Sequence, residues 1–161
     1  MRSIEFRVAS HECGWLREGE TVSVLEFLVD GVPFLELVRQ AELPDALAEQ
    51  AERAAEFTPE SAPLLAGDYM YPRRLSCAHL LGGKPDRVPH GAEEGESVLL
   101  GCTCGIDDCW ALTAKITVND TTVTWSDFRN THRDWNYDTI GVLTFSRQHY
   151  EGSLRTALAD C

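Results

Sequence analysis

Three of the six cysteines lie within eight residues, in the segment 101–110. Cys102, Cys104 and Cys109 have the spacing Cys-x-Cys-x4-Cys. Residues two apart on an extended strand point to the same side, with Cα atoms about 6.6 Å apart, so Cys102 and Cys104 can both turn toward one ion. The intervening loop would fold Cys109 back as a third ligand. Three thiolates suit a soft or borderline cation, so the segment predicts a zinc site.

A structural zinc site usually has four ligands, commonly three cysteines and one histidine. We expect His132 to be the fourth, because it follows a predicted hairpin that starts at Cys109 and can return to the cluster. Cys77 and His79 are the alternative ligands, and either would hold down the long middle segment. Water or a partner in the fourth position would instead leave an open, reactive site.

Two other interpretations of the cysteines stay open. Reduced cysteines are small apolar side chains that are often simply buried. Cys102 and Cys104 could also form an oxidation-sensitive pair in a thiol enzyme or redox protein, with Cys109 nearby. A reactive thiol needs nearby cations or a helix N-terminus to lower its pKa, whereas Asp107 and Asp108 act in the opposite direction. No catalytic residue is therefore assigned.

A second group of residues follows the predicted hairpin. Arg133, Trp135 and Tyr137 are types that concentrate at binding hot spots, so this connector is a possible recognition surface. The alternative is that the two aromatic residues anchor the connector to the core, with Arg133 paired to Asp134 or Asp138.

Composition limits the classes of protein. The 161 residues, 43% of them hydrophobic, predict a single domain over 1–161 with its own core. No apolar run is long enough to cross a membrane and no signal-peptide core is visible, so we expect a cytoplasmic protein with reduced cysteines. The net charge of −12 is concentrated in the first 68 residues. This charge disfavours nucleic acid and allows a basic protein partner, although acid excess also serves solubility.

In the first half, alternating apolar residues predict two paired strands, at 4–8 and 22–29, and Asp30-Gly31 is typical of a hairpin turn. A third element, strand or helix, begins at Val32 or Phe34 and should end at Pro44. A separate helix is expected over 45–57. The small apolar residues on one side of that helix are Leu47, Ala51, Ala54 and Ala55.

Residues 58–96 are rich in proline and glycine and predict a long irregular connection with short helical turns. A strand resumes at 97–100. The segments 111–118 and 122–128 predict the clearest hairpin, and a short strand at 142–145 precedes a terminal helix with Ser146 as its N-cap. The expected fold class is α+β, a mainly antiparallel sheet with helices packed on one face.

Several of these motifs together resemble a family of uncharacterised bacterial proteins, seen mostly in actinomycetes. The shared motifs are 27–33, 65–69, 99–105 with Cys109-Trp110, 123–125 with Phe128, His132-Arg133 with Trp135 and Tyr137, and Phe145 with Tyr150. The family usually has proline where this chain has Ala111 and Thr131. The resemblance groups the motifs into one unit and implies no activity.

These observations favour a binding or interaction module with a structural zinc site. A cysteine-dependent enzyme or thiol redox protein using Cys102, Cys104 or Cys109 is the alternative, and no nucleophile elbow, phosphate loop or dinucleotide motif supports another enzyme class. An acidic protein of the immunity or antitoxin type, which binds a basic partner, is a further possibility.

Overall fold

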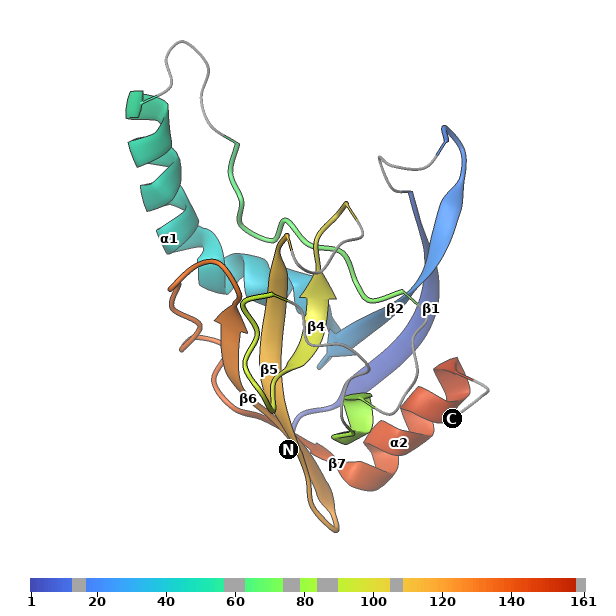
Figure 1. The fold of residues 1–161 in the computed structure, drawn as a ribbon. Coiled ribbons are helices and arrows are strands. Elements are labelled where there is room, and N and C mark those ends of the chain that lie inside the picture. Colours follow the sequence, from blue (N-terminus) through green and yellow to red (C-terminus); the bar gives the residue numbers. More distant parts are fainter. Residues whose placement is uncertain (13–16, 57–62, 74–78, 84–89, 105–108, 159–161) are drawn as a thin grey trace.

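The computed structural model describes residues 1–12, 17–56, 63–73, 79–83, 90–104 and 109–158. Two antiparallel sheets and two α-helices make an α+β fold, as the sequence predicts (Figure 1). No helix in the described part is long and apolar enough to cross a membrane. In chain order the elements are β1 (Ile4–Glu12), β2 (Thr21–Val29), β3 (Val32–Pro33), α1 (Phe34–Glu56), η1 (His79–Leu81), β4 (Ser97–Gly101), β5 (Ala111–Val118), β6 (Thr122–Asn130), β7 (Leu143–Ser146) and α2 (Arg147–Ala157).

The first sheet has the order β1-β2-β3. β1 and β2 pair antiparallel, with Phe6 opposite Phe27, which confirms the pairing of the two predicted strands. β2 turns into β3 at Asp30 and Gly31, whose φ angles are 51° and 80°. Positive φ at both central residues is the type I′ hairpin geometry that Asp-Gly favours, so the predicted turn is also confirmed.

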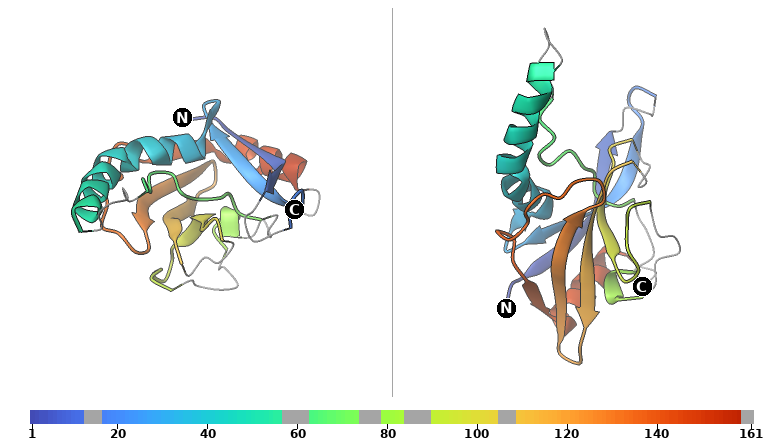
Figure 2. Two further views of the ribbon diagram at one scale, coloured as in Figure 1. Left: turned by 90° about the horizontal axis from the view of Figure 1, so that it is seen from above. Right: turned by 60° about the vertical axis from the view of Figure 1, so that its left-hand side comes forward.

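The second sheet has the order β4-β5-β6-β7. β5 and β6 form the predicted hairpin, with Val118 opposite Val123 next to the turn. β6 then pairs with β7, where Trp125 lies opposite Leu143. The connector between β6 and β7 therefore leaves one end of the sheet and returns to its edge (Figure 2).

Short bridges join the two sheets at both margins. On one side Met70 exchanges two backbone hydrogen bonds with Gly101 of β4, and the N–H of Leu25 in β2 donates to the carbonyl of Pro72. On the other side the N–H of Arg2 donates to the carbonyl of Thr144 in β7. The strands of both sheets thus surround one shared core.

Aromatic rings fill this core. Trp125 contacts the rings of Phe27, Phe34, Phe145 and Tyr150 at centroid distances of 5.3–6.1 Å. The indole N–H of Trp125 donates to the hydroxyl of Tyr150, which donates to the carbonyl of Leu80 in η1. Helix α2, capped by Ser146 as predicted, packs Tyr150 against Phe6 of β1.

The prediction that Pro44 ends an element is wrong, because α1 runs through it from Phe34 to Glu56. Proline removes one helical hydrogen bond, to the carbonyl of Gln40. Both Pro44 and Gln40 are exposed, so water can solvate that carbonyl. The helix changes direction near its middle (Figure 1), as expected at an internal proline.

One buried acid belongs to the second sheet. Glu96, 6% exposed, precedes β4 and pairs with Arg129 of β6 at 2.5 Å. Its carboxylate also accepts a hydrogen bond from the Thr113 hydroxyl of β5 at 2.7 Å. Burial alone would raise the pKa of Glu96, but the hydrogen bonds from Arg129, the Glu93 N–H and Thr113 lower it overall. This acid and its partners tie three strands together.

Residues 58–96 form the irregular connection that the sequence predicts, as far as they are described. In the described ranges 63–73, 79–83 and 90–96, the one helical turn is η1. Residues 70–73 supply the strand-like bridges that join β2 to β4.

Candidate functional site

The cysteine segment begins where β4 ends at Gly101. Cys102 is half-buried and packs against the core, whereas Cys104 and Cys109 are exposed. Trp110 and Ala111 then lead into β5, so the segment lies at one end of the second sheet. Packing in the core therefore accounts for Cys102 but not for the other two.

The thiols lie close enough to affect one another. The backbone N–H of Cys104 donates to the Sγ of Cys102 at 3.4 Å. Burial raises the pKa of the Cys102 thiol, the Cys104 N–H opposes this rise, and the thiols of Cys104 and Cys109 raise the pKa further. Mutual repulsion of this kind is relieved when a cation binds the thiolates.

The described side chains around the thiols do not by themselves form a complete metal site. In the part of the chain that the structure describes, which leaves out 105–108, no three His, Cys, Asp or Glu side chains form a group that could hold a metal ion. The type of donor fits zinc, and the described arrangement does not complete a set of ligands.

His132, the expected fourth ligand, lies in the segment that returns toward the cysteines. The N–H of Thr131 donates to the carbonyl of Ala111 at 3.0 Å, which places the residue before His132 beside the residue after Trp110. The His132 side chain is exposed, and its ring centroid is 6.1 Å from that of His90. The sequence analysis assigned His90 no role.

His79, one of the two alternative ligands, is not brought to the cluster. His79 is buried in η1. Gly82, just after η1, lies against Val118 at the other end of β5 from the cysteine segment. Since β5 spans eight residues, that separation is of the order of 20 Å. Cys77 lies outside the described residues.

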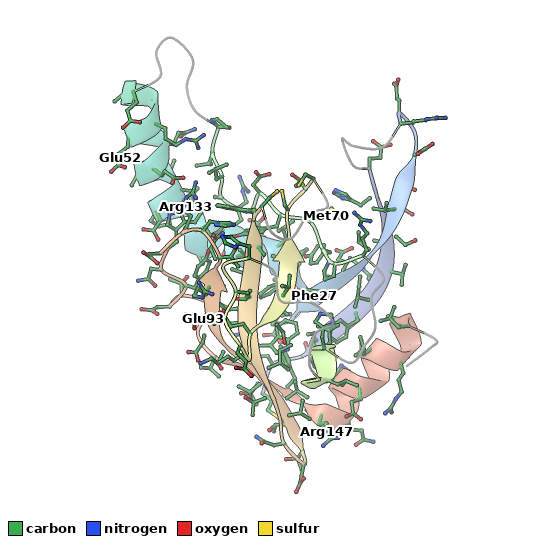
Figure 3. The ribbon with its side chains drawn as sticks, viewed as in Figure 1. Phe27, Glu52, Met70, Glu93, Arg133 and Arg147 are labelled. Carbon is green, nitrogen blue, oxygen red and sulfur yellow. The ribbon has the colours of Figure 1, made fainter. Side chains whose placement is uncertain are left out.

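Trp110 connects the cysteine segment to a layered cluster of rings. Tyr69 stacks on it at 5.5 Å with an interplanar angle of 28°, and Trp135 meets it edge to face at 5.7 Å. The Arg133 guanidinium lies 5.1 Å from the Trp110 ring centroid, and its Nε donates to Glu49 of α1 at 2.7 Å. Figure 3 shows Arg133 beside α1, above the end of the sheet. The indole N–H of Trp110 is the one buried side-chain N or O atom among the described residues that has no hydrogen-bond partner.

Beneath Tyr69 lies a fully buried acid, Glu42 of α1. Its Oε2 accepts hydrogen bonds from the hydroxyls of Tyr69 and Tyr137, both at 2.5 Å, and its Oε1 accepts the N–H of Gly67 at 2.9 Å. Asn130 in turn donates to the Tyr69 hydroxyl at 2.7 Å. Burial raises the pKa of Glu42, and the three donors oppose that rise only in part.

These contacts place the three predicted recognition residues. Tyr137 is buried against Glu42, and Arg133 and Trp135 are half-buried around Trp110. All three anchor the connector after β6 to α1 and the cysteine segment. Arg133 pairs with Glu49 of α1, whereas the core-anchor interpretation expected Asp134 or Asp138. Arg133 and Trp135 still contribute partly exposed surface.

The sequence analysis missed Glu42, Tyr69 and Asn130 as a unit. Glu42 is one of 26 acids, and nothing in its neighbours distinguishes it. The signal that could have identified it is the Leu-Ala-Gly-Asp-Tyr motif at 65–69, which carries two of its three hydrogen-bond donors.

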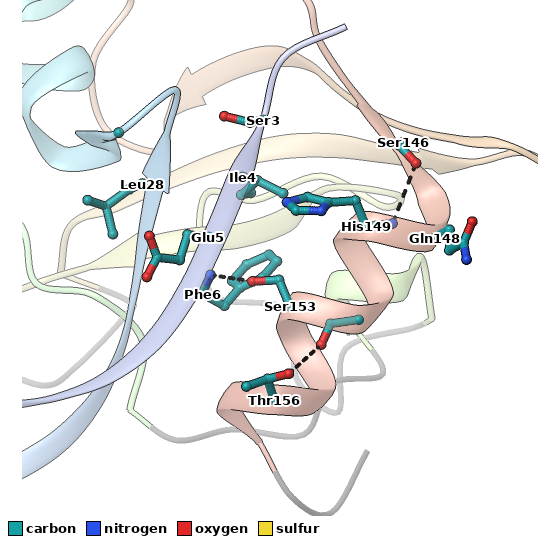
Figure 4. Close-up of a pocket in the computed structure, with 12 residues that line it drawn as sticks. Ser3, Ile4, Glu5, Phe6, Leu28, Ser146, Gln148, His149, Ser153 and Thr156 are labelled. Carbon is teal, nitrogen blue, oxygen red and sulfur yellow. Dashed lines mark hydrogen bonds between the residues drawn. The ribbon is translucent and has the colours of Figure 1, made fainter.

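A separate groove of about 890 Å³ runs between β1 and α2 (Figure 4). Its lining includes Glu5, Ser146 and His149, and the Ser153 hydroxyl there accepts the backbone N–H of Phe6 at 2.9 Å. None of the residues that the sequence singled out for chemistry lines this groove.

No protein-family model matches the chain, and no curated protein or solved structure matches it.

Proposed function

We propose that the protein is a binding module in which Cys102, Cys104 and Cys109 hold a structural zinc ion at the end of β4. The observation that carries the proposal is the close grouping of three thiols of unequal exposure. The half-buried Cys102 accepts the Cys104 N–H, and its pKa responds to both other thiols. Burial and the neighbouring thiols raise the pKa of Cys102 overall, and a bound cation would offset this rise together with the Cys104 N–H, which favours the thiolate that binds zinc.

Exposure favours this role over simple burial. A cysteine that serves as a small apolar core residue is buried, but Cys104 and Cys109 are exposed. The two interpretations therefore predict different results for a cysteine-to-serine change at an exposed position. The change lowers stability if the thiol binds zinc and leaves stability unchanged if it does not. Zinc bound there would join β4, β5 and Trp110 to the connector, with His132 as the proposed fourth ligand.

Metal analysis of the purified protein tests the proposal. We expect elemental mass spectrometry to find about one equivalent of zinc per chain. The variant Cys104→Ser should lose the zinc and unfold at a lower temperature, although it removes no buried side chain. Cys13→Ser, outside the segment, is the matched control and should keep both.

A folded, metal-free protein whose Cys104 and Cys109 react rapidly with iodoacetamide at neutral pH would contradict the zinc proposal. That result would favour the thiol enzyme or redox protein. If Cys104→Ser loses the zinc but unfolds at the same temperature as the native protein, a structural role for this thiol is excluded.

A further inference from the structure

The second half of α1 has its polar side toward the protein and its apolar side toward water. Amphipathic helices in soluble proteins normally have the opposite arrangement. Figures 1 and 2 show this half of α1 rising beyond the sheets, and no other described element lies along its outer side.

Four polar residues form the inward side, at helical spacing. Glu42 accepts the hydrogen bonds described above, Asp45 accepts the N–H of Asn136 at 2.9 Å, and Glu49 pairs with Arg133. Arg53 donates to the carbonyl of Pro63 at 3.4 Å. These bonds fix the rotation of the helix, so the opposite side cannot turn inward without breaking them.

The outward side is a row of apolar residues that we call the α1 outer face: Leu43, Leu47, Ala48, Ala51 and Ala55. Leu43 is 36% and Leu47 is 49% exposed, and the three alanines are also exposed. Neither leucine belongs to the hydrophobic clusters of the fold. The spacing of four residues in 43, 47, 51 and 55 is that of one helical stripe.

This stripe continues toward the start of the helix. Gln40 precedes Leu43 by three residues, and Leu37 precedes Gln40 by three. Both line a hollow of about 300 Å³ together with Ile140 and Leu143. Exposed apolar rows of this kind occur at protein interfaces. The row can pack against an apolar face of a partner, and the hollow can hold one larger side chain of that partner.

Charge indicates which partner fits. Glu52 and Glu56 are exposed along one flank of the α1 outer face, and Figure 3 shows Glu52 on the outer part of the helix. The two arginines of α1 are already engaged, Arg39 near Glu36 and Arg53 at Pro63. A second copy would bring another net charge of −12 to this surface, and like charges disfavour such a contact.

We infer that the α1 outer face binds an amphipathic helix of a protein partner that carries lysine or arginine beside its apolar stripe. Leucine-sized side chains of that helix would pack between Leu43 and Leu47, and its basic residues would pair with Glu52 and Glu56. The inference rests on the proposed role as a binding module and does not depend on zinc. It names the partner by chemistry, as a basic amphipathic helix.

A synthetic helical peptide of about five turns, with a leucine stripe flanked by lysines, is the probe. We expect binding by calorimetry that weakens about tenfold in the variant Leu43→Gln/Leu47→Gln. Glu52→Gln/Glu56→Gln should weaken it about threefold and reduce its dependence on salt. Val8→Gln, which changes an apolar residue 42% exposed on β1, outside the α1 outer face and its hollow, is the control and should change nothing.

Circular dichroism of each variant separates loss of binding from loss of folding, and the changed positions are exposed, so the fold should survive. Equal binding of a peptide with the same composition in scrambled order would overturn the inference. Sedimentation that shows a dimer of the native protein, dissociated by Leu47→Gln, would also overturn it and assign the face to a second copy. Zinc content is measured in the same samples, so failure here and failure of the zinc proposal are distinguishable.

Discussion

Two buried glutamates hold the molecule together in different ways. Glu96 is paired with a guanidinium and a hydroxyl inside one sheet, and Glu42 is surrounded by three neutral donors from two separate segments, 65–69 and the connector after β6. The pKa of Glu96 is lowered and that of Glu42 is raised. Burial therefore does not by itself decide the direction of the pKa shift: a countercharge offsets desolvation for Glu96, and hydroxyl and amide donors offset it only in part for Glu42.

The largest expected effect is at the Glu42 cluster. Glu42→Ala leaves two hydroxyls and the Gly67 N–H without their acceptor in a buried site, so we expect a loss of about 4 kcal/mol in the free energy of unfolding. Glu52→Ala, an exposed acid on the same helix, is the matched control and should lose less than about 0.5 kcal/mol. Urea denaturation measures both. Similar losses in the two variants would mean that burial of Glu42 has no special role.

The corresponding change in the second sheet is Arg129→Met. It leaves the Glu96 carboxylate buried without its countercharge, and we expect a loss of about 3 kcal/mol, at the low end for a buried pair because Arg129 is partly exposed. Arg129→Lys keeps the charge and should recover part of the loss. If the double variant Arg129→Met/Glu96→Gln is no more stable than Arg129→Met alone, an unpaired charge is not the cause.

The two tyrosines of the Glu42 cluster should differ. Tyr69 donates to Glu42 and also accepts the Asn130 amide, so Tyr69→Phe should lose about 2 kcal/mol. Tyr137 donates to the same carboxylate, but the Asn130 amide donates to Tyr69, so Tyr137→Phe should lose about 1 kcal/mol. Thermal unfolding of the two variants provides the comparison. A larger loss in Tyr137→Phe than in Tyr69→Phe would mean that the Asn130 hydrogen bond does not stabilise the fold.

The smallest effect is in the dependence of stability on pH, and its sign differs between the two acids. The folded-state pKa of Glu42 is raised, so the stability linked to its protonation is present below its unfolded value and is lost as the pH rises through the folded value. The folded-state pKa of Glu96 is lowered, so its contribution is present above the unfolded value and is lost as the pH falls. Unfolding of the native protein, Glu42→Gln and Glu96→Gln is measured from about pH 3 to about pH 8, a range that includes the titration of carboxyl groups. The change of unfolding free energy with pH gives both slopes. Slopes of the same sign would contradict the comparison.

The strands were the predictable part of this fold. Alternation of apolar residues identified the two hairpins, and Asp30-Gly31 and Ser146 marked a turn and a helix start by their own chemistry. These signals are local, so a single sequence contains them.

Helix α1 was mispredicted because its continuity is a tertiary effect. Local rules end a helix at Pro44, but Glu42 before it and Asp45 and Glu49 after it are all bonded to distant segments. These bonds hold both halves of the helix against the rest of the protein despite the missing backbone bond and the bend. The same reason hid Glu42, whose partners lie 25 to 95 residues away.

The cysteine segment was predictable as a cluster but not as a complete site. Spacing placed Cys102 and Cys104 together, and the return of the chain at Thr131 agrees with the expected path toward His132. Which ligand, if any, completes the set depends on side-chain positions that spacing does not determine.

The bond from Arg2 to Thr144 has a consequence for how the chain acquires its structure. It joins residues that are 142 apart in sequence, and the first sheet cannot close onto the second until both are present. Closing so long a loop early is entropically unfavourable, and proteins rich in distant pairings fold slowly. During synthesis β1 and β2 can pair as soon as both have emerged from the ribosome. The contact between Arg2 and Thr144 forms only after β7 has emerged.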